Sequence, residues 1–375
     1  MRKRVAFIGI KGLPSKGGAE RVVESIVLRL HRQYDIFVYC DSRYTPATFH
    51  MPGIRLLRIP STPGKYLRTP SLVILSSLHA LILGDYDLVH LHNAETSFAL
   101  PLLRIRYKAI ATCHGPAYAR AKWGFLAKAC MRGMEALFVL FGTTLTSVSH
   151  TMVSYYSSKF NRSVAYIPNG VELNPKVDRN GATRMLRVNN VSPKQYILFA
   201  AGRVEPTKGC HLLLEAFGEM DDEVPLLVVG DINQVPSYKQ ELLERADARV
   251  KFLPFISSKE SLFGLVQEAR IFVFPSTVEA MSMMLLEAAS LGTPILASDI
   301  PENTKVLHKY ALFFKSGDAK DLRHKLRWAL DHAKSMEQLA ENARYWVLRN
   351  YAWDEVVTKY NGLYEKVLCP SHSPS

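Results

Sequence analysis

The sequence contains no apolar run that reaches the roughly 18–20 residues needed to cross a membrane as a helix. Its longest apolar stretch, residues 72–83, is interrupted by Ser76, Ser77 and His79. The amino-terminal apolar segment spans about six residues, shorter than the ~7–15 of a secretory signal, and no small-residue cleavage site follows it. A first β-strand explains this segment better. These absences predict a protein that is soluble or peripheral to a membrane.

Cysteine is scarce as well. The five cysteines lack both the paired spacing of a disulfide framework and the short spacing of a metal site; they are Cys40, Cys113, Cys130, Cys210 and Cys369. Free thiols in a reducing compartment are the simplest interpretation. We therefore expect a cytoplasmic protein, held on the inner face of the plasma membrane if it is peripheral.

Negative charge is scarce in the first half only. Residues 1–175 contain 22 Lys and Arg against 9 Asp and Glu, a net charge of +13, whereas residues 176–375 contain 25 of each. This asymmetry predicts an anionic partner for the first half, and a membrane surface, a lipid phosphate and a nucleic acid are the candidates. Nucleic acid is disfavoured because no groove-reading or base-stacking motif is present.

Short apolar segments of strand type alternate with segments of helical periodicity along the 375-residue chain. This alternation is typical of parallel α/β sheets, and the length suits two domains of ordinary size. In the first half the expected strands span residues 5–10, 36–40, 54–59, 88–91, 109–112 and 145–148, and the expected helices span residues 19–32, 70–83 and 119–140.

The pattern breaks over residues 171–194, which are polar and lack a core rhythm. A second series of strands then covers residues 196–201, 226–229, 250–252, 271–274 and 294–298. We predict two doubly wound, Rossmann-like domains over residues 1–170 and 195–352, joined by a linker over residues 171–194. A helix with a short tail, residues 353–375, completes the chain, and the sequence does not specify where it packs.

The first glycine-containing loop, residues 11–18, directly follows a predicted strand and precedes a predicted helix. Paired glycines at Gly17 and Gly18 would let backbone N–H groups approach a bound group closely. The loop is neither a dinucleotide-binding nor an ATP-binding glycine motif, so neither of those ligands follows. A tight strand-to-helix turn without a ligand stays the alternative.

A second loop, in the segment AAGRVEPTKG, places Arg203 and Lys208 just beyond a predicted strand. A guanidinium and an ammonium facing one ligand would hold a diphosphate. They would also stabilise the negative charge on a departing nucleoside diphosphate. Solvated loop charges are the alternative for each residue taken singly.

Two glutamates, Glu279 and Glu287, flank the start of a predicted helix that follows a strand. Ser282 can cap this helix, which leaves the backbone N–H groups of Met283 and Met284 directed at a phosphate. This combination suits a ligand that is anionic and has several hydroxyls, such as a nucleotide-sugar. The alternative is a loop charge and a surface glutamate, which the apolar neighbours of Glu287 disfavour.

Histidines gather behind two strands of the first half. His114 follows a buried strand and could be either a reacting-centre residue or a satisfied structural group. His90 and His92 alternate with apolar residues, which favours a structural role. Asn93 directly follows them and is a candidate for binding an acceptor.

Eight segments of the sequence together resemble the retaining family 4 glycosyltransferases with the GT-B fold, of the kind that assemble bacterial polysaccharides. They are, in chain order, KGLPSKGGAE, DLVHLHN, TCHG, SVSHTM, YIPNGVEL, GRVEPTKG, the pair Glu279 and Glu287 with seven residues between them, and EAASLGTPILAS. Each motif is degenerate, but they are spread over most of the chain in the order expected for that family.

The resemblance implies a role for each candidate residue. Arg203 and Lys208 would bind the donor diphosphate, Glu287 the ribose, and Glu279 the transferred sugar. Gly17 and Gly18 would lie against the donor phosphates from across a cleft, and His114 would approach the transferred sugar. Arg203, Lys208, Glu279 and His114 would be the catalytic set. The family's more common E-G-F-G is replaced by Glu279-Ala280-Met281-Ser282, so the identity of the donor sugar does not carry over.

The basic first half then suggests a membrane-interface element. Seven basic residues surround an aromatic-bearing stretch with Trp123, Phe125 and Leu126; they are Arg104, Arg106, Lys108, Arg120, Lys122, Lys128 and Arg132. Such a helix suits an anionic membrane surface. A solvated helix with one buried apolar side is the alternative.

The resemblance implies a retaining, metal-independent hexosyltransferase that uses a nucleotide-sugar as substrate and needs no cofactor. Its acceptor would be a saccharide or a polyprenyl-diphosphate-linked sugar, and its setting cell-surface polysaccharide biosynthesis. Two alternatives remain open at the level of sequence. One is a nucleotide-sugar epimerase of the same fold, and the other is a nucleic-acid-binding protein that uses the basic half.

Overall fold

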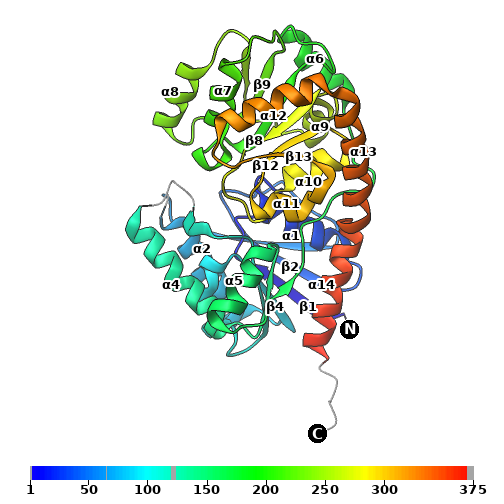
Figure 1. Ribbon diagram of the computed structural model, residues 1–375. Coiled ribbons are helices and arrows are strands. Elements are labelled where there is room, and N and C mark those ends of the chain that lie inside the picture. The colour runs from blue at the N-terminus through cyan, green and yellow to red at the C-terminus, as the bar shows by residue number, and fades with distance from the viewer. Residues whose placement is uncertain (1, 65, 120–123, 370–375) are drawn as a thin grey trace. The chain divides into compact units, whose positions relative to one another are not determined.

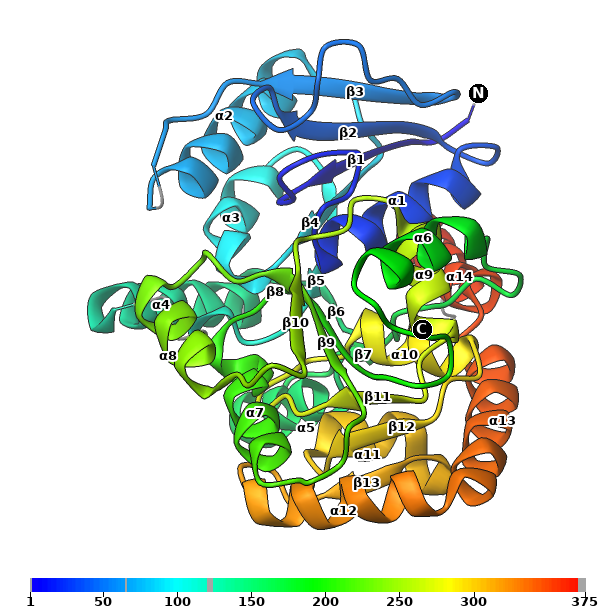
Figure 2. The same cartoon turned by 90° about the horizontal axis from the view of Figure 1, so that it is seen from above.

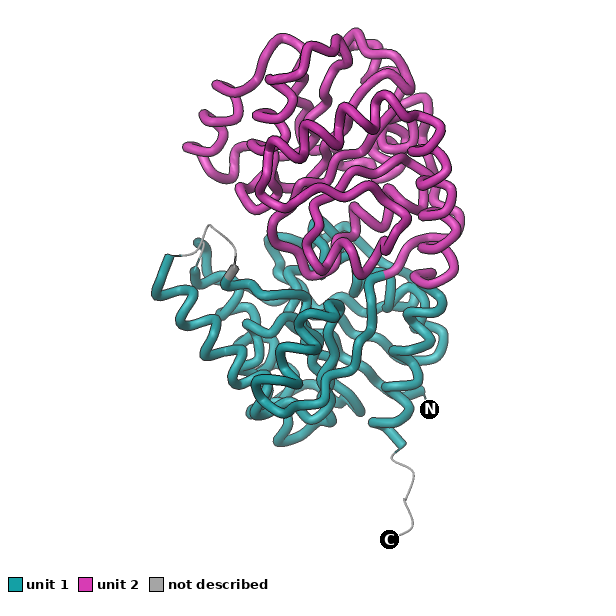
Figure 3. The backbone as a smooth tube through the Cα atoms, in the orientation of Figure 1, with its two compact units in different colours: residues 1–169, 353–375 teal, residues 170–352 magenta. Residues whose placement is uncertain are grey.

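Two compact units make up the chain. The computed structural model describes residues 2–64, 66–119 and 124–369. The first unit comprises Met1–Asn169 together with Trp353–Ser375, and the second comprises Gly170–Ala352. Figure 3 shows that the chain returns to the first unit after completing the second.

The first unit contains a seven-stranded parallel sheet in the order β3-β2-β1-β4-β5-β6-β7, part of which can be followed in Figure 2. This is the doubly wound arrangement that the sequence predicted. The strands are β1 (Arg4–Ile8), β2 (Asp35–Asp41), β3 (Ile54–Ile59), β4 (Leu88–His92), β5 (Lys108–Cys113), β6 (Thr144–Ser147) and β7 (Ala165–Tyr166).

The helices of this unit cover both faces of its sheet. Because parallel crossovers are right-handed, the connections that lead from β3 towards β7 lie on one face, and the β1-to-β2 connection lies on the other. The first face carries α2 (Arg68–Leu83), the 3-10 helix η1 (Ala94–Ala99), α3 (Leu100–Leu103), α4 (Phe125–Phe141) and α5 (His150–Phe160). The second face carries α1 (Gly18–Leu30) and, packed beside it, α14 (Trp353–Leu368).

The C-terminal helix α14 belongs to the first unit because of its aromatic side. Tyr360 and Tyr364 are fully buried, and the Tyr364 hydroxyl lies 2.6 Å from Nδ1 of His90 on β4. At the outer edge the Arg29 guanidinium of α1 forms a 2.9 Å ion pair with Asp354. The sequence predicted a helix at this end of the chain, but only the structure places it on the first sheet.

The second unit contains a six-stranded parallel sheet in the order β10-β9-β8-β11-β12-β13. Its strands are β8 (Ile197–Arg203), β9 (Leu226–Asp231), β10 (Val250–Leu253), β11 (Ile271–Phe274), β12 (Ile295–Ser298) and β13 (Leu312–Phe314). Its helices, several labelled in Figure 1, are α6 (Arg179–Val188), η3 (Pro206–Lys208), α7 (Cys210–Gly218), α8 (Pro236–Arg245), α9 (Lys259–Gln267), α10 (Met283–Ser290), α11 (Pro301–Leu307), η4 (His308–Tyr310), α12 (Ala319–Asp331) and α13 (Ala333–Asn350).

The segment over residues 171–194 is not a linker throughout, and that prediction needs correction. Residues 179–188 form α6, which packs against α9 of the second unit. Asp178 caps the helix by accepting a 2.8 Å hydrogen bond from the Gly181 N–H, and it accepts a second from the Ser261 hydroxyl. Ala182 and Leu186 are its buried apolar side chains. Two apolar positions are too few to produce a recognisable helical periodicity in a polar segment.

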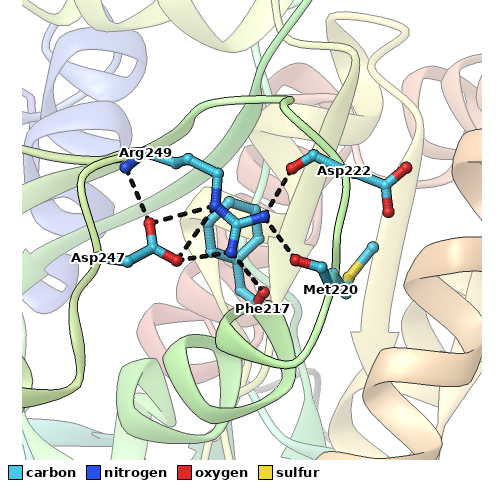
Figure 4. A network of polar contacts seen from close by, with 5 residues as sticks. All are labelled: Phe217, Met220, Asp222, Asp247 and Arg249. Carbon is cyan, nitrogen blue, oxygen red and sulfur yellow. Dashed lines mark hydrogen bonds and ion pairs between the residues drawn. The ribbon is translucent and has the colours of Figure 1, made fainter.

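Arg249, which follows α8, forms hydrogen bonds at the C-terminal end of α7. The Arg249 guanidinium donates hydrogen bonds to the backbone carbonyls of Phe217, Met220 and Asp222 at 3.1, 2.7 and 2.6 Å. It also pairs with Asp247 at 2.6 Å and lies 4.3 Å from the centre of the Phe217 ring. Figure 4 shows how these residues surround the guanidinium. The Phe217 carbonyl lies in the last turn of α7, and those of Met220 and Asp222 lie in the loop after it, so the cation satisfies acceptors that have no partner within the helix.

Replacing Arg249 with alanine should destabilise the second unit by about 2–3 kcal/mol, because several charge-assisted hydrogen bonds are lost together. Thermal or urea denaturation measures this change. Arg245→Ala is the matched control, since Arg245 forms exposed ion pairs with Glu215 and Glu241 that are worth less than about 1 kcal/mol. Equal losses in the two variants would contradict the assigned role of Arg249.

Candidate active site

The candidate residues of the second unit gather at the carboxyl edge of its sheet. Arg203 ends β8, and Lys208 ends η3 directly after it. Glu279 lies in the loop after β11, the strand next to β8 in the sheet. Because the carboxyl ends of neighbouring parallel strands share one edge, these loops meet there.

The two loops are tied to each other by their backbones. The Thr277 N–H donates a 2.9 Å hydrogen bond to the Thr207 carbonyl. Gly209 adopts φ +71°, and a Cβ at this position would lie only 2.0 Å from the carbonyl oxygen of Pro275. A glycine is therefore needed after Lys208 both for the left-handed backbone and for this close approach.

The loop contact places Lys208 and Glu279 in an ion pair, with Nζ 2.5 Å from Oε1. Glu279 is largely buried, while Lys208 is half-buried. The sequence had assigned these two residues to different parts of a ligand and did not predict that they would touch. An anionic ligand that takes the ammonium would leave the carboxylate able to accept hydrogen bonds from hydroxyl groups.

Arg203 is the more exposed cation of this edge, with 40% of its side chain accessible. Its Nε lies 3.5 Å from the carboxylate of Glu205, which is buried. The sequence assigned no role to Glu205, although it stands inside the quoted GRVEPTKG segment. The Glu205 carboxylate orients the Arg203 guanidinium at the end of β8.

Glu287 is a buried carboxylate on α10 that pairs with a lysine of another helix. Lys259, the first residue of α9, brings its Nζ within 3.2 Å of Oε1 of Glu287. Sequence reasoning missed Lys259, because nothing in the local pattern links the start of α9 to α10. The burial of Glu287 agrees with its apolar neighbours in the sequence.

The helix cap expected at Ser282 is present. Ser282 precedes α10, and its hydroxyl accepts a 3.3 Å hydrogen bond from the Leu285 N–H. Met283 and Met284 are thus the first two residues of the helix, so their N–H groups have no acceptor within it. A binding role for these two N–H groups stays a prediction.

In the first unit, Gly17 caps α1 and Gly18 begins it. Gly17 has φ −142°, an extended conformation that any residue adopts, and a Cβ on Gly18 would meet nothing within 4 Å. The fold of this unit therefore does not require glycine at position 18. Close approach of a ligand to the backbone would be one reason for a glycine at this position.

Three histidines lie in contact at the ends of β4 and β5: His90 and His92 are buried residues of β4, and the partly buried His114 follows β5. His92 Nδ1 lies 2.9 Å from His114 Nε2, and their rings are stacked. His90 bonds to Tyr364 and to the Thr112 hydroxyl, each at 2.6 Å. The prediction that His90 and His92 are structural agrees with their complete burial.

The pair formed by His92 and His114 has a preferred arrangement of protons. Nε2 of His92 is buried without a hydrogen-bond partner among the described residues. A buried lone pair without a partner costs less free energy than a buried N–H without a partner. The proton of His92 is therefore placed on Nδ1, which donates a hydrogen bond to Nε2 of His114. His114 then carries its own proton on Nδ1 and can donate it to a ligand hydroxyl.

Asn93 has a structural task in this unit. Its side-chain amide donates a 2.8 Å hydrogen bond to the carbonyl of Gly9 at the end of β1. Gly9 itself has φ +99°, and a Cβ there would lie 2.2 Å from the His92 carbonyl oxygen. These contacts join the ends of β1 and β4 and explain Asn93 without a ligand, so its role towards an acceptor stays a prediction.

No group of three or more His, Cys, Asp or Glu side chains suited to a metal ion occurs in the described part of the chain. Nor does any helix within those residues have the length and apolar character to span a membrane.

Comparison with known proteins covers both units. Residues 16–175 match the family model described as Glycosyltransferase Family 4, and residues 183–346 match the model described as Glycosyl transferases group 1. Each model matches most of one of the two units, which agrees with the order of the motifs in the sequence.

Individual relatives are similar over most of the chain. The MMP alpha-(1->4)-mannosyltransferase of Mycolicibacterium hassiacum is 24% identical over 76% of this chain and 72% of its own. The UDP-Gal:alpha-D-GlcNAc-diphosphoundecaprenol alpha-1,3-galactosyltransferase of Escherichia coli is 22% identical over 80% of this chain and 81% of its own. Sucrose-phosphate synthase from Thermosynechococcus elongatus has a similar solved structure, with a TM-score of 0.84 and 19% identity over 99% of this chain and 100% of its own.

Proposed function

We propose, on the premise that this chain belongs to the glycosyltransferases with the GT-B fold, that its second unit binds a nucleotide-sugar. The sugar would pass to a saccharide or to a polyprenyl-diphosphate-linked acceptor. The observation that carries this proposal is the arrangement of charges at one sheet edge: Arg203, the pair Lys208 and Glu279, and the pair Lys259 and Glu287.

Each part of a nucleotide-sugar has a suitable partner in this arrangement. Phosphate oxygens need cations and N–H donors, which Arg203, Lys208 and the start of α10 supply. Ribose and hexose hydroxyls need acceptors, and Glu287 and Glu279 are carboxylates already held in place by their lysines. The same set would serve without a divalent cation, so we propose a metal-independent reaction.

The proposed reaction transfers the sugar with retention of its anomeric configuration. The acceptor oxygen bonds to the anomeric carbon on the face from which the diphosphate departs, and the bond from that carbon to the phosphate oxygen breaks. The departing phosphate oxygen takes the proton of the acceptor hydroxyl. Lys208 and Arg203 would stabilise the charge that develops on the diphosphate.

The first unit would contribute His114, Gly17 and Gly18 to the same reaction. His114, with its proton on Nδ1, would donate a hydrogen bond to a hydroxyl of the transferred sugar. The name of the Escherichia coli relative gives a diphosphoundecaprenol-linked acceptor, which supports a lipid-linked acceptor and a place in polysaccharide assembly for this chain.

A panel of UDP-, GDP- and dTDP-sugars in a thermal-shift measurement tests the donor site directly. One class of donor should raise the melting temperature, and NMR of the product of its reaction should show a retained anomeric configuration. Activity should survive chelation of divalent metals. If no nucleotide-sugar stabilises the protein, the proposed donor site is wrong.

Replacing Glu287 with glutamine should weaken binding of that donor about 10–100-fold, because hydrogen bonds from hydroxyls to a carboxylate become bonds to a neutral amide. Isothermal titration calorimetry with the donor measures the affinity. Glu241→Gln is the matched control, since Glu241 forms an exposed ion pair on α8. Unchanged affinity in Glu287→Gln would remove Glu287 from the site.

A further inference from the structure

The outward side of α2 is apolar, where a helix of a soluble domain normally exposes charge. Its exposed side chains are Ile74, Leu75, Leu78, Ile82 and Leu83. Arg68, at the first position, is the only Lys, Arg, Asp or Glu among the 16 residues of this helix. The inner side packs Leu72, Val73 and Ala80 into the core, so α2 is apolar on both sides.

The same character continues over the neighbouring helices. Six side chains on these elements are each between 71% and 84% exposed; they are Ile82, Leu83, Ile105, Phe125, Leu126 and Leu140. The short helix α3 contacts both α2 and α4, and Figure 1 and Figure 2 place α2 and α4 on the same side of this unit. We call the exposed apolar residues of α2, α4 and the turn after α3 the apolar face.

Basic residues border the apolar face at the ends of its helices. The guanidinium of Arg104 donates a 2.7 Å hydrogen bond to the Phe141 carbonyl at the end of α4. That of Arg106 donates to the Leu81 carbonyl near the end of α2. Lys128 and Arg132 lie on α4 itself. Positive charge is thus fixed next to the most exposed aliphatic side chains.

Three of the four acidic residues of this region have partners outside the apolar face. Residues 66–141 contain four acidic residues in all. Asp85 and Asp87 pair with Arg4 and Lys3 beside β1. Glu135 is buried and accepts a 2.8 Å hydrogen bond from Tyr156.

We propose that the apolar face is a docking surface for an anionic lipid bilayer. Its aliphatic and aromatic side chains would enter the boundary between headgroups and acyl chains, and Arg104, Arg106, Lys128 and Arg132 would contact lipid phosphates. A second copy of this chain is a poorer occupant, because pairing two such faces would bring their basic borders together. This inference does not depend on the proposed transfer reaction.

The structure changes which residues carry the membrane contact. The sequence centred that contact on residues 104–132, of which Arg120, Lys122 and Trp123 lie outside the described residues. Lys108 does not belong to the apolar face, because its ammonium donates to the Leu368 carbonyl at the end of α14. α2, which the sequence indicated only as a helix, supplies the largest part of the face.

Co-sedimentation of the full chain with vesicles tests the proposal. Vesicles of phosphatidylcholine with about one third phosphatidylglycerol should bind the protein at least about ten-fold more tightly than phosphatidylcholine alone, and added salt should weaken the binding. The double variant Ile82→Glu with Leu126→Glu should lose about ten-fold or more of this affinity, because two carboxylates would have to enter the headgroup boundary.

Val188→Glu is the matched control, since Val188 is 82% exposed on α6 of the second unit and lies outside the apolar face. It should leave vesicle binding unchanged. All variants should keep the melting temperature of the unchanged protein without any ligand, which shows that they are folded and separates this test from that of the proposed function.

Three outcomes would overturn the docking surface. They are equal binding to both kinds of vesicle, equal binding of the double variant and the unchanged protein, and a concentration-dependent dimer that the double variant abolishes. The last of these would assign the apolar face to self-association.

Discussion

Replacing Lys208 with alanine is expected to lower kcat/KM for sugar transfer by about 10²–10³-fold. Loss of one preorganised donor aimed at developing negative charge typically has an effect of this size. Here the ammonium is held 2.5 Å from Glu279 at the sheet edge where the diphosphate would bind. The variant also leaves Glu279 without its cation, so both the leaving group and the transferred sugar would lose a partner.

Initial rates over a range of donor concentrations measure this effect. Most of the loss should fall on kcat, because the charge on the diphosphate grows as the glycosidic bond breaks. Lys239→Ala is the matched control, since Lys239 is an exposed lysine of the same unit bonded to Asn233. A Lys208→Ala enzyme that retained more than about a tenth of its kcat/KM would rule out this electrostatic role.

The first unit is expected to lose about 4 kcal/mol of stability or more when the pH falls from 7 to 5. Burial lowers the pKa of His90 to about 3 and that of His114 to about 4, and it lowers the pKa of His92 well below its ordinary value. In the unfolded chain each histidine titrates near pH 6.5. Each then gains a proton on unfolding, which is worth about 2 kcal/mol per histidine at pH 5.

The sign of this pH dependence follows from the number of protons that the unfolded and folded states bind. Between pH 6.5 and about 4 the unfolded state binds more protons than the folded state, so stability rises with pH. Asp41 and Asp87 have pKa values lowered below their usual range despite burial, because backbone and side-chain hydrogen bonds favour their charged forms. Their contribution is lost only below about pH 4. Burial raises the pKa of Glu135 above its ordinary value, so this carboxyl opposes the histidine effect in the window above about pH 4 and makes the net slope smaller.

Urea denaturation at a series of pH values between 7 and 4.5 measures the dependence. The slope of stability against pH measures how many protons are taken up on unfolding. His92→Asn should lower that number by about one, because one of the three titrating groups is removed. His324→Asn, at an exposed position of α12, is the control for the substitution itself. A flat profile over this range would mean that the histidines are protonated in the folded state or open readily to water.

The strands and the helix cap at Ser282 could be predicted because their signals are local. The bounds expected for residues 54–59 and 271–274 agree with β3 and β11, since each is a run of apolar or β-branched residues between turn signals. Ser282 was identifiable as a cap because a short polar side chain directly precedes an apolar helical segment. The fold class follows from the regular alternation of such segments, and the structure confirms it.

The pairs that build the candidate site could not be predicted. Lys208 and Glu279 are 71 residues apart and meet because β8 and β11 are neighbours although β9 and β10 come between them in sequence. Lys259 meets Glu287 through the packing of α9 beside α10. The local sequence indicates three of these residues as site candidates, but it does not show which charges meet, because that depends on which strands and helices become neighbours.

The sequence by itself determined two Rossmann-like units, the residues at the ends of their strands, and a basic first half. These properties follow from periodicity, turn residues and composition, all of which are read over short windows of the chain. The tertiary structure decided where α14 packs, which carboxylate faces which lysine, and that α2 keeps an apolar side uncovered. Those outcomes depend on which elements become neighbours, and apolar burial, which drives that assembly, acts between segments far apart in the sequence.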